Sequence, residues 1–171
     1  MMWEVPLFKL NYDECEQHAV RQVIESGWLT MGSVTERFET SFANFLGSAV
    51  KCSAVSSGTA ALHMALLALD IKADDEVIIP AVTFVADANV VRMVGAKPVL
   101  ADSASLEDFN VSSETIEQKI APKAKAVIVV HFAGYPCDMP EITELCRARG
   151  IHLIEDVAHA PGASVEGKMC G

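Results

Sequence analysis

Positive charge is scarce in this sequence, and it contains no long hydrophobic run. The 13 Lys and Arg residues are outnumbered by 23 Asp and Glu residues, which gives a net charge of −10. A nucleic-acid binder needs clustered positive charge to meet the phosphate backbone, and so does a protein that docks on an anionic membrane. A transmembrane helix needs about 20 consecutive apolar residues. We therefore expect neither a nucleic-acid nor a membrane partner.

The sequence also lacks the cysteine and histidine patterns of disulfide frameworks and metal sites. Its five cysteines are odd in number and include no C-x-x-C pair, and residues 1–4 do not begin a signal peptide. These features predict a reducing, cytoplasmic location. His131, His152 and His159 do not have the spacing of metal ligands, so we predict no metal site.

Three common active-site motifs are missing as well. The sequence has no G-x-x-x-x-G-K-[ST], no G-x-G-x-x-G and no G-x-S-x-G. An ATPase loop, a dinucleotide-binding fingerprint and a serine-hydrolase elbow are therefore unsupported. Hydrophobic residues make up 51% of the 171 residues, which predicts a globular domain with a substantial core. This apolar surplus indicates faces left for a further segment or a partner chain.

What is present is an alternation of helical and extended patterns, which is typical of an α/β fold with a mostly parallel sheet flanked by helices. Helices are predicted over residues 11–24, 35–46, 59–69, 84–94, 113–120 and 138–149. Strands are predicted over residues 76–79, 98–101, 125–130 and 152–155, with a short β-like stretch at 52–55. The run 125–130 is apolar enough to be buried on both faces of the sheet.

Small and hydroxyl residues open the predicted helix that begins near residue 58. The stretch 56–63 reads SSGTAALH. Exposed N–H groups and the helix dipole at such a start favour an anion such as phosphate, and small residues let a ligand approach the backbone. The alternative is an ordinary helix N-cap, because Ser and Thr are common there. The residues alone leave both interpretations open.

A carboxylate and an imidazole follow the last predicted strand. Ligands of open parallel sheets bind outside the carboxyl ends of the strands. Asp156 is placed there to hold a positive charge such as a protonated ring nitrogen, and His159 is close enough in sequence to contact the same ligand. The alternative is that Asp156 caps the next turn and that His159 is a loop histidine.

Two further residues lie at predicted strand ends. Phe84 follows the strand that ends near Pro80, and an aromatic side chain there can stack on a flat ring. Core packing is the competing interpretation for a single phenylalanine. His131 follows the strand 125–130 and either faces a ligand or has a buried structural role.

Taken in order, these stretches resemble one family, the DegT-type aminotransferases, which act on nucleotide-linked keto-sugars and have the aspartate-aminotransferase-like fold. The resemblance is colinear and covers nearly the whole chain. The matching stretches are 27–32 (GWLTMG), 38–39 (FE), 56–63 (SSGTAALH), 75–86 (DEVIIPAVTFVA), 95–99 (GAKPV), 130–134 (VHFAG), 138–139 (DM) and 155–160 (EDVAHA).

The resemblance implies pyridoxal 5′-phosphate as the cofactor. By the family pattern, its phosphate is held at the helix start by Gly58, Thr59 and Ala60. Phe84 is expected to stack on the ring. Asp156 is expected to pair with the ring nitrogen and keep it protonated, which makes the ring an electron sink.

The resemblance places His159 near the phenolic oxygen of the ring. It also requires a lysine that bonds the cofactor and moves the proton, and in the family this lysine follows a Ser-Phe segment at a position beyond Gly171. Lys168 is the one lysine after Asp156, but its Glu-Gly-Lys-Met setting matches an earlier turn of the family. We therefore assign no catalytic residue in this chain.

The resemblance implies that residues 1–171 are the N-terminal part of a cofactor-binding large domain, without the lysine segment and the small C-terminal domain. The implied reaction moves an amino group from an amino acid, glutamate by analogy, to a keto-sugar on a nucleotide. The expected assembly is a homodimer or a complex with a complementing chain. Two alternatives stay open: a truncated, non-catalytic remnant or partner protein, and a sugar dehydratase that uses the same cofactor.

Overall fold

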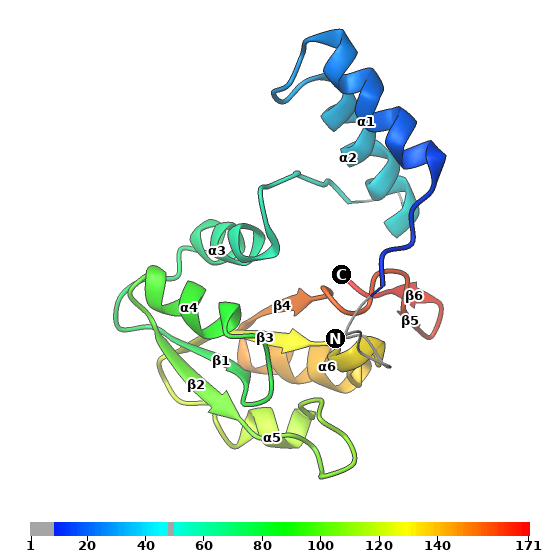
Figure 1. Cartoon of the computed structure of the whole chain (residues 1–171). Helices are drawn as coiled ribbons and strands as arrows, with labels where there is room; N and C mark the ends of the chain where they lie inside the picture. Colours follow the sequence, from blue (N-terminus) through cyan, green and yellow to red (C-terminus); the bar gives the residue numbers. More distant parts are fainter. Residues whose placement is uncertain (1–8, 48–49) are drawn as a thin grey trace, which may run out of the picture. The chain divides into compact units, whose positions relative to one another are not determined.

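Figure 1 shows the chain as a computed structural model, in which residues 9–47 and 50–171 are described. The chain divides into two compact units, residues 1–54 and 55–171. Within the described ranges, no helix is long and apolar enough to cross a membrane.

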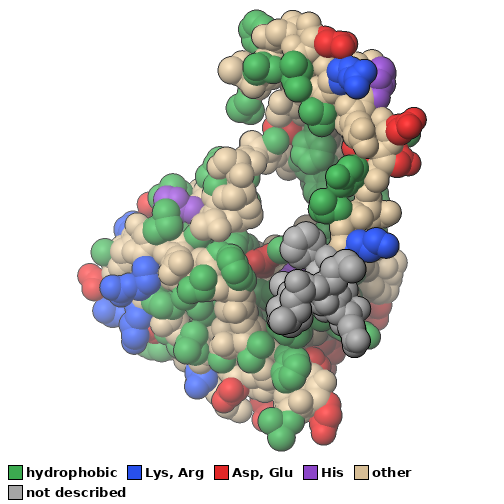
Figure 2. All heavy atoms as spheres, viewed as in Figure 1, with side chains coloured by type: hydrophobic (Ala, Val, Ile, Leu, Met, Phe, Trp, Pro, Cys, Tyr) green, Lys and Arg blue, Asp and Glu red, His purple; other side chains and the backbone are tan. Residues whose placement is uncertain are grey.

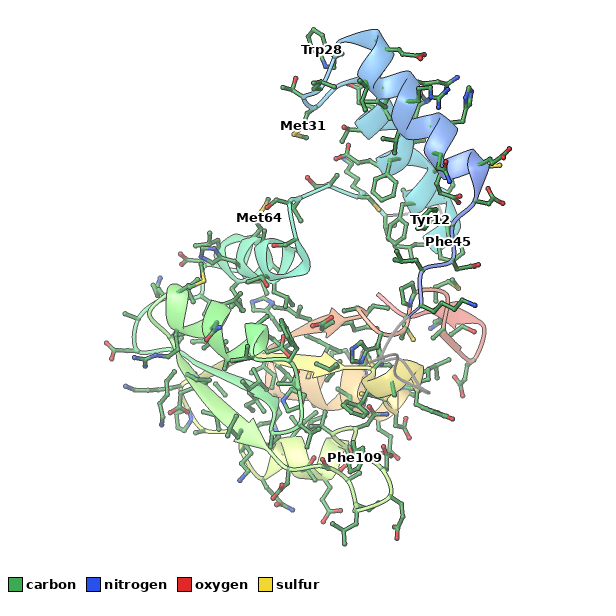
Figure 3. All side chains as sticks on the ribbon, in the orientation of Figure 1. Tyr12, Trp28, Met31, Phe45, Met64 and Phe109 are labelled. Carbon is green, nitrogen blue, oxygen red and sulfur yellow. The ribbon has the colours of Figure 1, made fainter. Side chains whose placement is uncertain are left out.

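The first unit contains two helices, α1 (Glu14–Ser26) and α2 (Ser33–Leu46). Asp13 begins α1 with a capping box, in which its side chain accepts the Cys15 N–H at 2.7 Å. Trp28 and Met31 lie in the turn between the helices (Figure 3), where the indole N–H donates to the Met31 carbonyl at 3.0 Å. Neither helix has a buried residue. Among the described residues of this unit, a side-chain cap begins α1, whereas α2 begins at Gly32 without one.

The second unit contains a four-stranded parallel sheet in the order β2-β1-β3-β4. Its strands are β1 (Glu76–Pro80), β2 (Lys97–Ala101), β3 (Ala124–Val130) and β4 (His152–Asp156). The central strand β3 is buried at six of its seven positions. Because all four strands are parallel, their carboxyl ends meet at one edge of the sheet.

Helices cover both faces of this sheet (Figure 1). On one face, α3 (Gly58–Ala68) and α4 (Ala86–Met93) pack with β1 and β3 around a cluster that includes Leu66 and Val90. On the other face, α5 (Ser113–Glu117) and α6 (Met139–Arg149) pack around Ile116 and Ile142. Each fully buried aliphatic side chain contributes about 1.5–3 kcal/mol. These two clusters therefore hold the carboxyl edge of the sheet in place.

Short segments complete the second unit beyond the carboxyl edge. A 3-10 turn, η1 (Phe132–Gly134), follows β3, and a small antiparallel hairpin is formed by β5 (Ser164–Val165) and β6 (Lys168–Met169). The parallel α/β architecture predicted from the sequence is confirmed. The β-like stretch at 52–55 is wrong, because the structure has no strand there. The helix predicted over 113–120 is too long, since α5 ends at Glu117.

Candidate functional site

The start of α3 is capped by a side chain of its own. The Ser57 side chain accepts the Ala60 N–H at 3.1 Å, so the capping interpretation of this stretch is correct for Ser57. The first N–H groups of a helix have no partner within the helix. Because the cap uses the Ala60 N–H, the groups at this start that remain for an anion are those of Gly58 and Thr59.

Gly58 has no structural reason within the chain to be glycine. A methyl group built on Gly58 meets no atom within 4 Å, so the space beside its backbone is open. Its φ angle is not positive, and α3 would form equally well with alanine there. An open approach to a helix start suits a bound phosphate, which needs close contact with backbone N–H groups.

Asp156 is the last residue of β4 and lies at the carboxyl edge of the sheet. One carboxylate oxygen, Oδ1, accepts the Ala158 N–H at 2.9 Å, which makes a local turn. Its backbone carbonyl accepts the His131 N–H at 3.3 Å, so the ends of β3 and β4 are joined. Asp156 is half-buried, and its second oxygen, Oδ2, is the atom available to a cationic ligand.

His159 is held by the turn that follows β3. Its Nδ1 accepts the Ala133 N–H at 3.3 Å, and its ring lies edge-on to Phe132 with centroids 6.1 Å apart. Gly134, at φ +90°, allows this approach, since an added methyl would come within 3.2 Å of the His159 carbonyl. Because Nδ1 is the acceptor, a neutral ring carries its proton on Nε2. His159 can therefore donate one hydrogen bond to an oxygen of a ligand.

Phe84 lies just before α4 and is 70% exposed. Its ring is free of the core, so the core-packing interpretation of this residue is wrong. An exposed aromatic ring beside the carboxyl edge is available to stack on a flat ligand.

His131 belongs to the structure rather than to a ligand. The ring is fully buried: Nδ1 accepts the Cys137 N–H at 3.0 Å, and Nε2 lies 3.0 Å from Glu155 Oε2. Burial alone would raise the pKa of Glu155, but hydrogen bonds from His131 and from the Gly171 N–H hold that pKa below its ordinary value. The structural interpretation of His131 is therefore the correct one.

His131, Glu155 and Cys170 place one potential metal ligand each within 4.8 Å of one another. The hydrogen bond from Cys137 N–H keeps the imidazole proton on Nε2, which is the atom that would have to bind the metal. Metal binding at Nε2 would move that proton to Nδ1, against the Cys137 N–H. The cluster therefore fits a closed hydrogen-bond network better than a metal site.

Asp87, in the first turn of α4, is a buried acid that sequence reasoning missed. The Thr83 hydroxyl donates to its Oδ2, while its Oδ1 has no partner. Burial raises the pKa of Asp87 to about 6, the Thr83 hydrogen bond opposes the rise, and the negative charge of Asp156 adds to it. The four-residue spacing of Thr83 and Asp87 is the one sequence signal that points to this pair.

The structure thus gathers several predicted residues at one edge of the second unit. Asp156 ends β4 and His159 lies three residues later, and the negative charge of Asp156 contributes to the raised pKa of Asp87 at the start of α4. The helix start at Gly58 belongs to α3, which packs with α4 in one core cluster. Simultaneous contact of these residues with one ligand stays a prediction. Among the cavities of the described chain, one of ≈ 220 Å³ lies beside Glu155 and the β5–β6 hairpin, and one of ≈ 440 Å³ lies beside Phe132, whose ring is next to His159.

Comparison with known families gives a match over nearly the whole chain. The sequence profile described as the DegT/DnrJ/EryC1/StrS aminotransferase family matches residues 11–171. GDP-perosamine synthase of Vibrio cholerae is 42% identical over 168 residues, which cover 98% of this chain and 45% of that protein. The chain thus spans less than half the length of this relative.

Solved structures agree with the sequence match. The aminotransferase TlmJ of Streptoalloteichus hindustanus superposes with a TM-score of 0.92 at 38% identity, over 98% of this chain and 46% of its own. The GDP-4-keto-6-deoxy-D-mannose-3-dehydratase of Escherichia coli, solved with bound hydrated pyridoxal phosphate, gives a TM-score of 0.91 at 28% identity, over 100% of this chain and 45% of its own. Aminotransferases and a dehydratase therefore share this fold.

Proposed function

Because the chain belongs to the DegT/DnrJ/EryC1/StrS aminotransferase family, we propose that it is the N-terminal part of the pyridoxal-phosphate-binding large domain of a sugar aminotransferase. The proposed reaction transfers an amino group from an amino acid, glutamate in our proposal, to a nucleotide-linked keto-sugar. The proposed setting is cytoplasmic, in a homodimer or with a complementing chain. The cofactor supplies an electron sink for the proton shift at the amino carbon when it is bound.

The observation that carries the proposal is the position of Asp156 at the carboxyl edge of the parallel sheet. One oxygen is fixed by the Ala158 N–H, and the second is available to a protonated ring nitrogen. A carboxylate in this position keeps the ring nitrogen protonated, because an opposite charge at close range favours the charged form.

The other proposed contacts are each supported by the local geometry. The N–H groups of Gly58 and Thr59 bind the phosphate, with Ala60 providing a small first turn that Ser57 caps. Phe84 stacks on the ring from its exposed position. His159 donates from Nε2 to the phenolic oxygen. These residues bind and orient the cofactor, and no residue of this chain is assigned the role of the covalent lysine.

Equilibrium dialysis of the chain with pyridoxal phosphate tests the proposal, with the cofactor absorbance as a second readout. We expect saturable binding that the Asp156→Asn variant weakens about 10- to 150-fold, since a charge-assisted contact contributes about 1.5–3 kcal/mol. Asp102→Asn is the matched control, because Asp102 is exposed and directly follows β2, the outermost strand on the side of the sheet away from β4. The absence of binding to the unmodified chain contradicts the proposal.

A dehydratase is the second candidate, and the likeness to the Escherichia coli dehydratase favours it specifically. The two functions can be distinguished by product analysis after the full-length protein is incubated with a nucleotide-linked keto-sugar and glutamate. An aminotransferase yields an amino-sugar and consumes one glutamate per turnover. A dehydratase yields a deoxy-keto-sugar without a net amino group in the product.

A further inference from the structure

Ala133, in the η1 turn that follows β3, has a backbone conformation that is unusual for its residue type. Its φ and ψ angles are 54° and 20°, in the left-handed region, and Gly134 follows at φ +90°. A residue with a Cβ atom is disfavoured in that region and stays there where surrounding contacts hold it. The Ala133 N–H is the group that His159 Nδ1 accepts at 3.3 Å. The turn is therefore strained at the residue that orients this imidazole.

Asn110, in the loop before α5, holds this turn from outside. Its side chain is buried, with the whole residue 6% exposed. Oδ1 accepts the Phe132 N–H at 2.9 Å, and Nδ2 donates to the Tyr135 carbonyl at 3.0 Å. The two bonds reach the residues on either side of Ala133 and Gly134. One amide side chain therefore joins both ends of the strained turn.

The loop that carries Asn110 is itself ordered by local hydrogen bonds. The Asn110 N–H donates to Asp108 Oδ1 at 3.0 Å, and the Asn110 carbonyl accepts the Ala104 N–H at 2.7 Å. Ser105 Oγ accepts the N–H groups of Glu107 and Asp108 at 3.1 and 3.0 Å. The backbone of Asn110 is thus fixed before its side chain reaches the η1 turn.

Aromatic contacts connect the same loop to His159. Phe109, labelled in Figure 3, lies edge-on to Phe132 with ring centroids 5.4 Å apart, and Phe132 lies edge-on to His159 at 6.1 Å. Edge-to-face pairs at such distances attract each other. Because Phe109 and Asn110 are neighbours in sequence, one short segment supports the imidazole through both its ring contacts and its hydrogen-bonded turn.

We propose that Asn110 is a positioning residue of the cofactor site, which holds the Ala133 N–H against Nδ1 of His159 and so keeps the imidazole proton on Nε2. This inference rests on the proposed function, in which His159 donates from Nε2 to the phenolic oxygen. The other tautomer would present a lone pair to that oxygen and lose the hydrogen bond. Asn110 thus acts on the cofactor through the turn and through His159.

The direct test is nuclear magnetic resonance of the full chain, labelled with nitrogen-15 in its histidines and free of cofactor, at pH 8, where an ordinary histidine is neutral. The ring-nitrogen shifts give the tautomer ratio, and the His159→Ala variant identifies the His159 signals. The Nε2–H form is expected to dominate in the wild type. Asn110→Ala is expected to raise the ratio of Nδ1–H to Nε2–H about fivefold, the effect of losing one ordinary hydrogen bond.

Two further variants separate the role of Asn110 from general effects of substitution. Asn110→Asp retains an oxygen for the Phe132 N–H but loses the donor to the Tyr135 carbonyl, so its tautomer ratio is expected to lie between those of the wild type and Asn110→Ala. Asn89→Ala is the matched control, because Asn89 is an exposed asparagine on α4 of the same unit, and it is expected to leave the ratio unchanged.

Pyridoxal-phosphate affinity, measured by equilibrium dialysis, gives a second readout in a double-mutant cycle. Asn110→Ala is expected to weaken binding about two- to tenfold, because the imidazole is no longer preorganised. In the His159→Ala background the same substitution is expected to have no further effect, since the two residues act in one chain of contacts.

An equal tautomer ratio in the wild type and Asn110→Ala overturns the inference. A wild type in which the Nδ1–H form dominates does so as well, and this result needs no substitution at Asn110. Equal losses of affinity from Asn110→Ala with and without His159 would show that Asn110 acts independently of the imidazole, which also contradicts the inference. No cofactor binding by the wild type refutes the proposed function instead, and the tautomer measurement, made without cofactor, still decides whether Asn110 orients His159.

Discussion

The buried carboxyl group of Asp87 makes the folded protein less stable as pH rises, which is the opposite of the usual effect of an aspartate. Burial and the nearby charge of Asp156 raise the pKa of Asp87 to about 6 from an ordinary value of 3.8. Between these two pH values the folded chain keeps a proton that the unfolded chain has lost. The contribution of Asp87 to stability therefore falls as pH rises from about 4 to 6 and stays lower above that range.

We expect Asp87→Asn to stabilise the cofactor-free protein more at pH 8 than at pH 4. The difference between the two pH values is about 2–3 kcal/mol, because the pKa rises by about two units and one pKa unit corresponds to about 1.36 kcal/mol. Urea unfolding of the wild type and the variant at both pH values measures it. A stability difference that does not change with pH would contradict a raised pKa at Asp87.

Two glycines offer the same substitution with opposite expected results. Alanine at Gly58 meets open space and lies in a helix, so Gly58→Ala is expected to leave the free energy of unfolding unchanged or raise it by up to about 1 kcal/mol. Gly134 has φ +90°, and its added methyl would come within 3.2 Å of the His159 carbonyl. Gly134→Ala is expected to cost about 1–2 kcal/mol.

Cofactor affinity tests whether Gly58 is needed for phosphate binding, whereas Gly134 is needed for the backbone conformation. Gly58→Ala is expected to weaken pyridoxal-phosphate binding although the fold is intact, because the methyl group occupies the approach to the helix start. Thermal unfolding and dialysis on the same samples give both quantities. Unchanged binding by Gly58→Ala would remove the support that this residue gives to the phosphate site.

At the scale of elements, the sequence predicts helix ends and buried strands correctly where a few neighbouring residues determine them. Gly27, Gly47 and Gly150 end α1, α2 and α6 in the left-handed conformation, and the apolar run of β3 is central and buried. The prediction at 52–55 is wrong because a few apolar residues alone do not form a strand without a neighbouring strand to pair with.

The candidate site is only partly predictable from the sequence, and the reason is physical. The strand-end rule locates Asp156, and the helix-start rule locates Gly58. The tautomers of His131 and His159 depend on the N–H groups of Cys137 and Ala133, which the fold brings to them. The four-residue spacing of Thr83 and Asp87 does not show that Asp87 is buried or that its Oδ1 has no hydrogen-bond partner. Both features depend on the fold.

The central strand should dominate the stability of the second unit. Ile128 on β3 is fully buried, and truncating a buried isoleucine to alanine costs about 2–5 kcal/mol through lost burial and the remaining cavity. Leu100 on the edge strand β2 is 55% exposed, so Leu100→Ala is expected to cost less than about 1 kcal/mol. Similar losses for both variants in chemical denaturation would contradict the observed burial of β3.

At the scale of the whole molecule, apolar surface is distributed unevenly. Phe38, Phe42 and Phe45 lie on one side of α2 with ring centroids 5.9 and 6.0 Å apart, and all three are exposed. Figure 2 shows hydrophobic side chains at the surface in both units. A soluble monomer rarely exposes a contiguous apolar patch of this kind. The three phenylalanines are therefore the first candidates for contact with another chain or segment.

We expect the isolated 171-residue chain to self-associate in a concentration-dependent way, as its surplus of apolar residues predicts. Replacing Phe38, Phe42 and Phe45 with serine removes stacked aromatic surface from α2 without touching the second unit, so association should weaken while the far-ultraviolet spectrum is retained. Exposed polar positions on the same helix, Thr40 and Ser41, supply the control as alanine variants. Static light scattering across a dilution series measures the mass. A monodisperse monomer at every concentration would show that this surface is stable in water by itself, and a mass unaffected by the triple substitution would place the contact elsewhere.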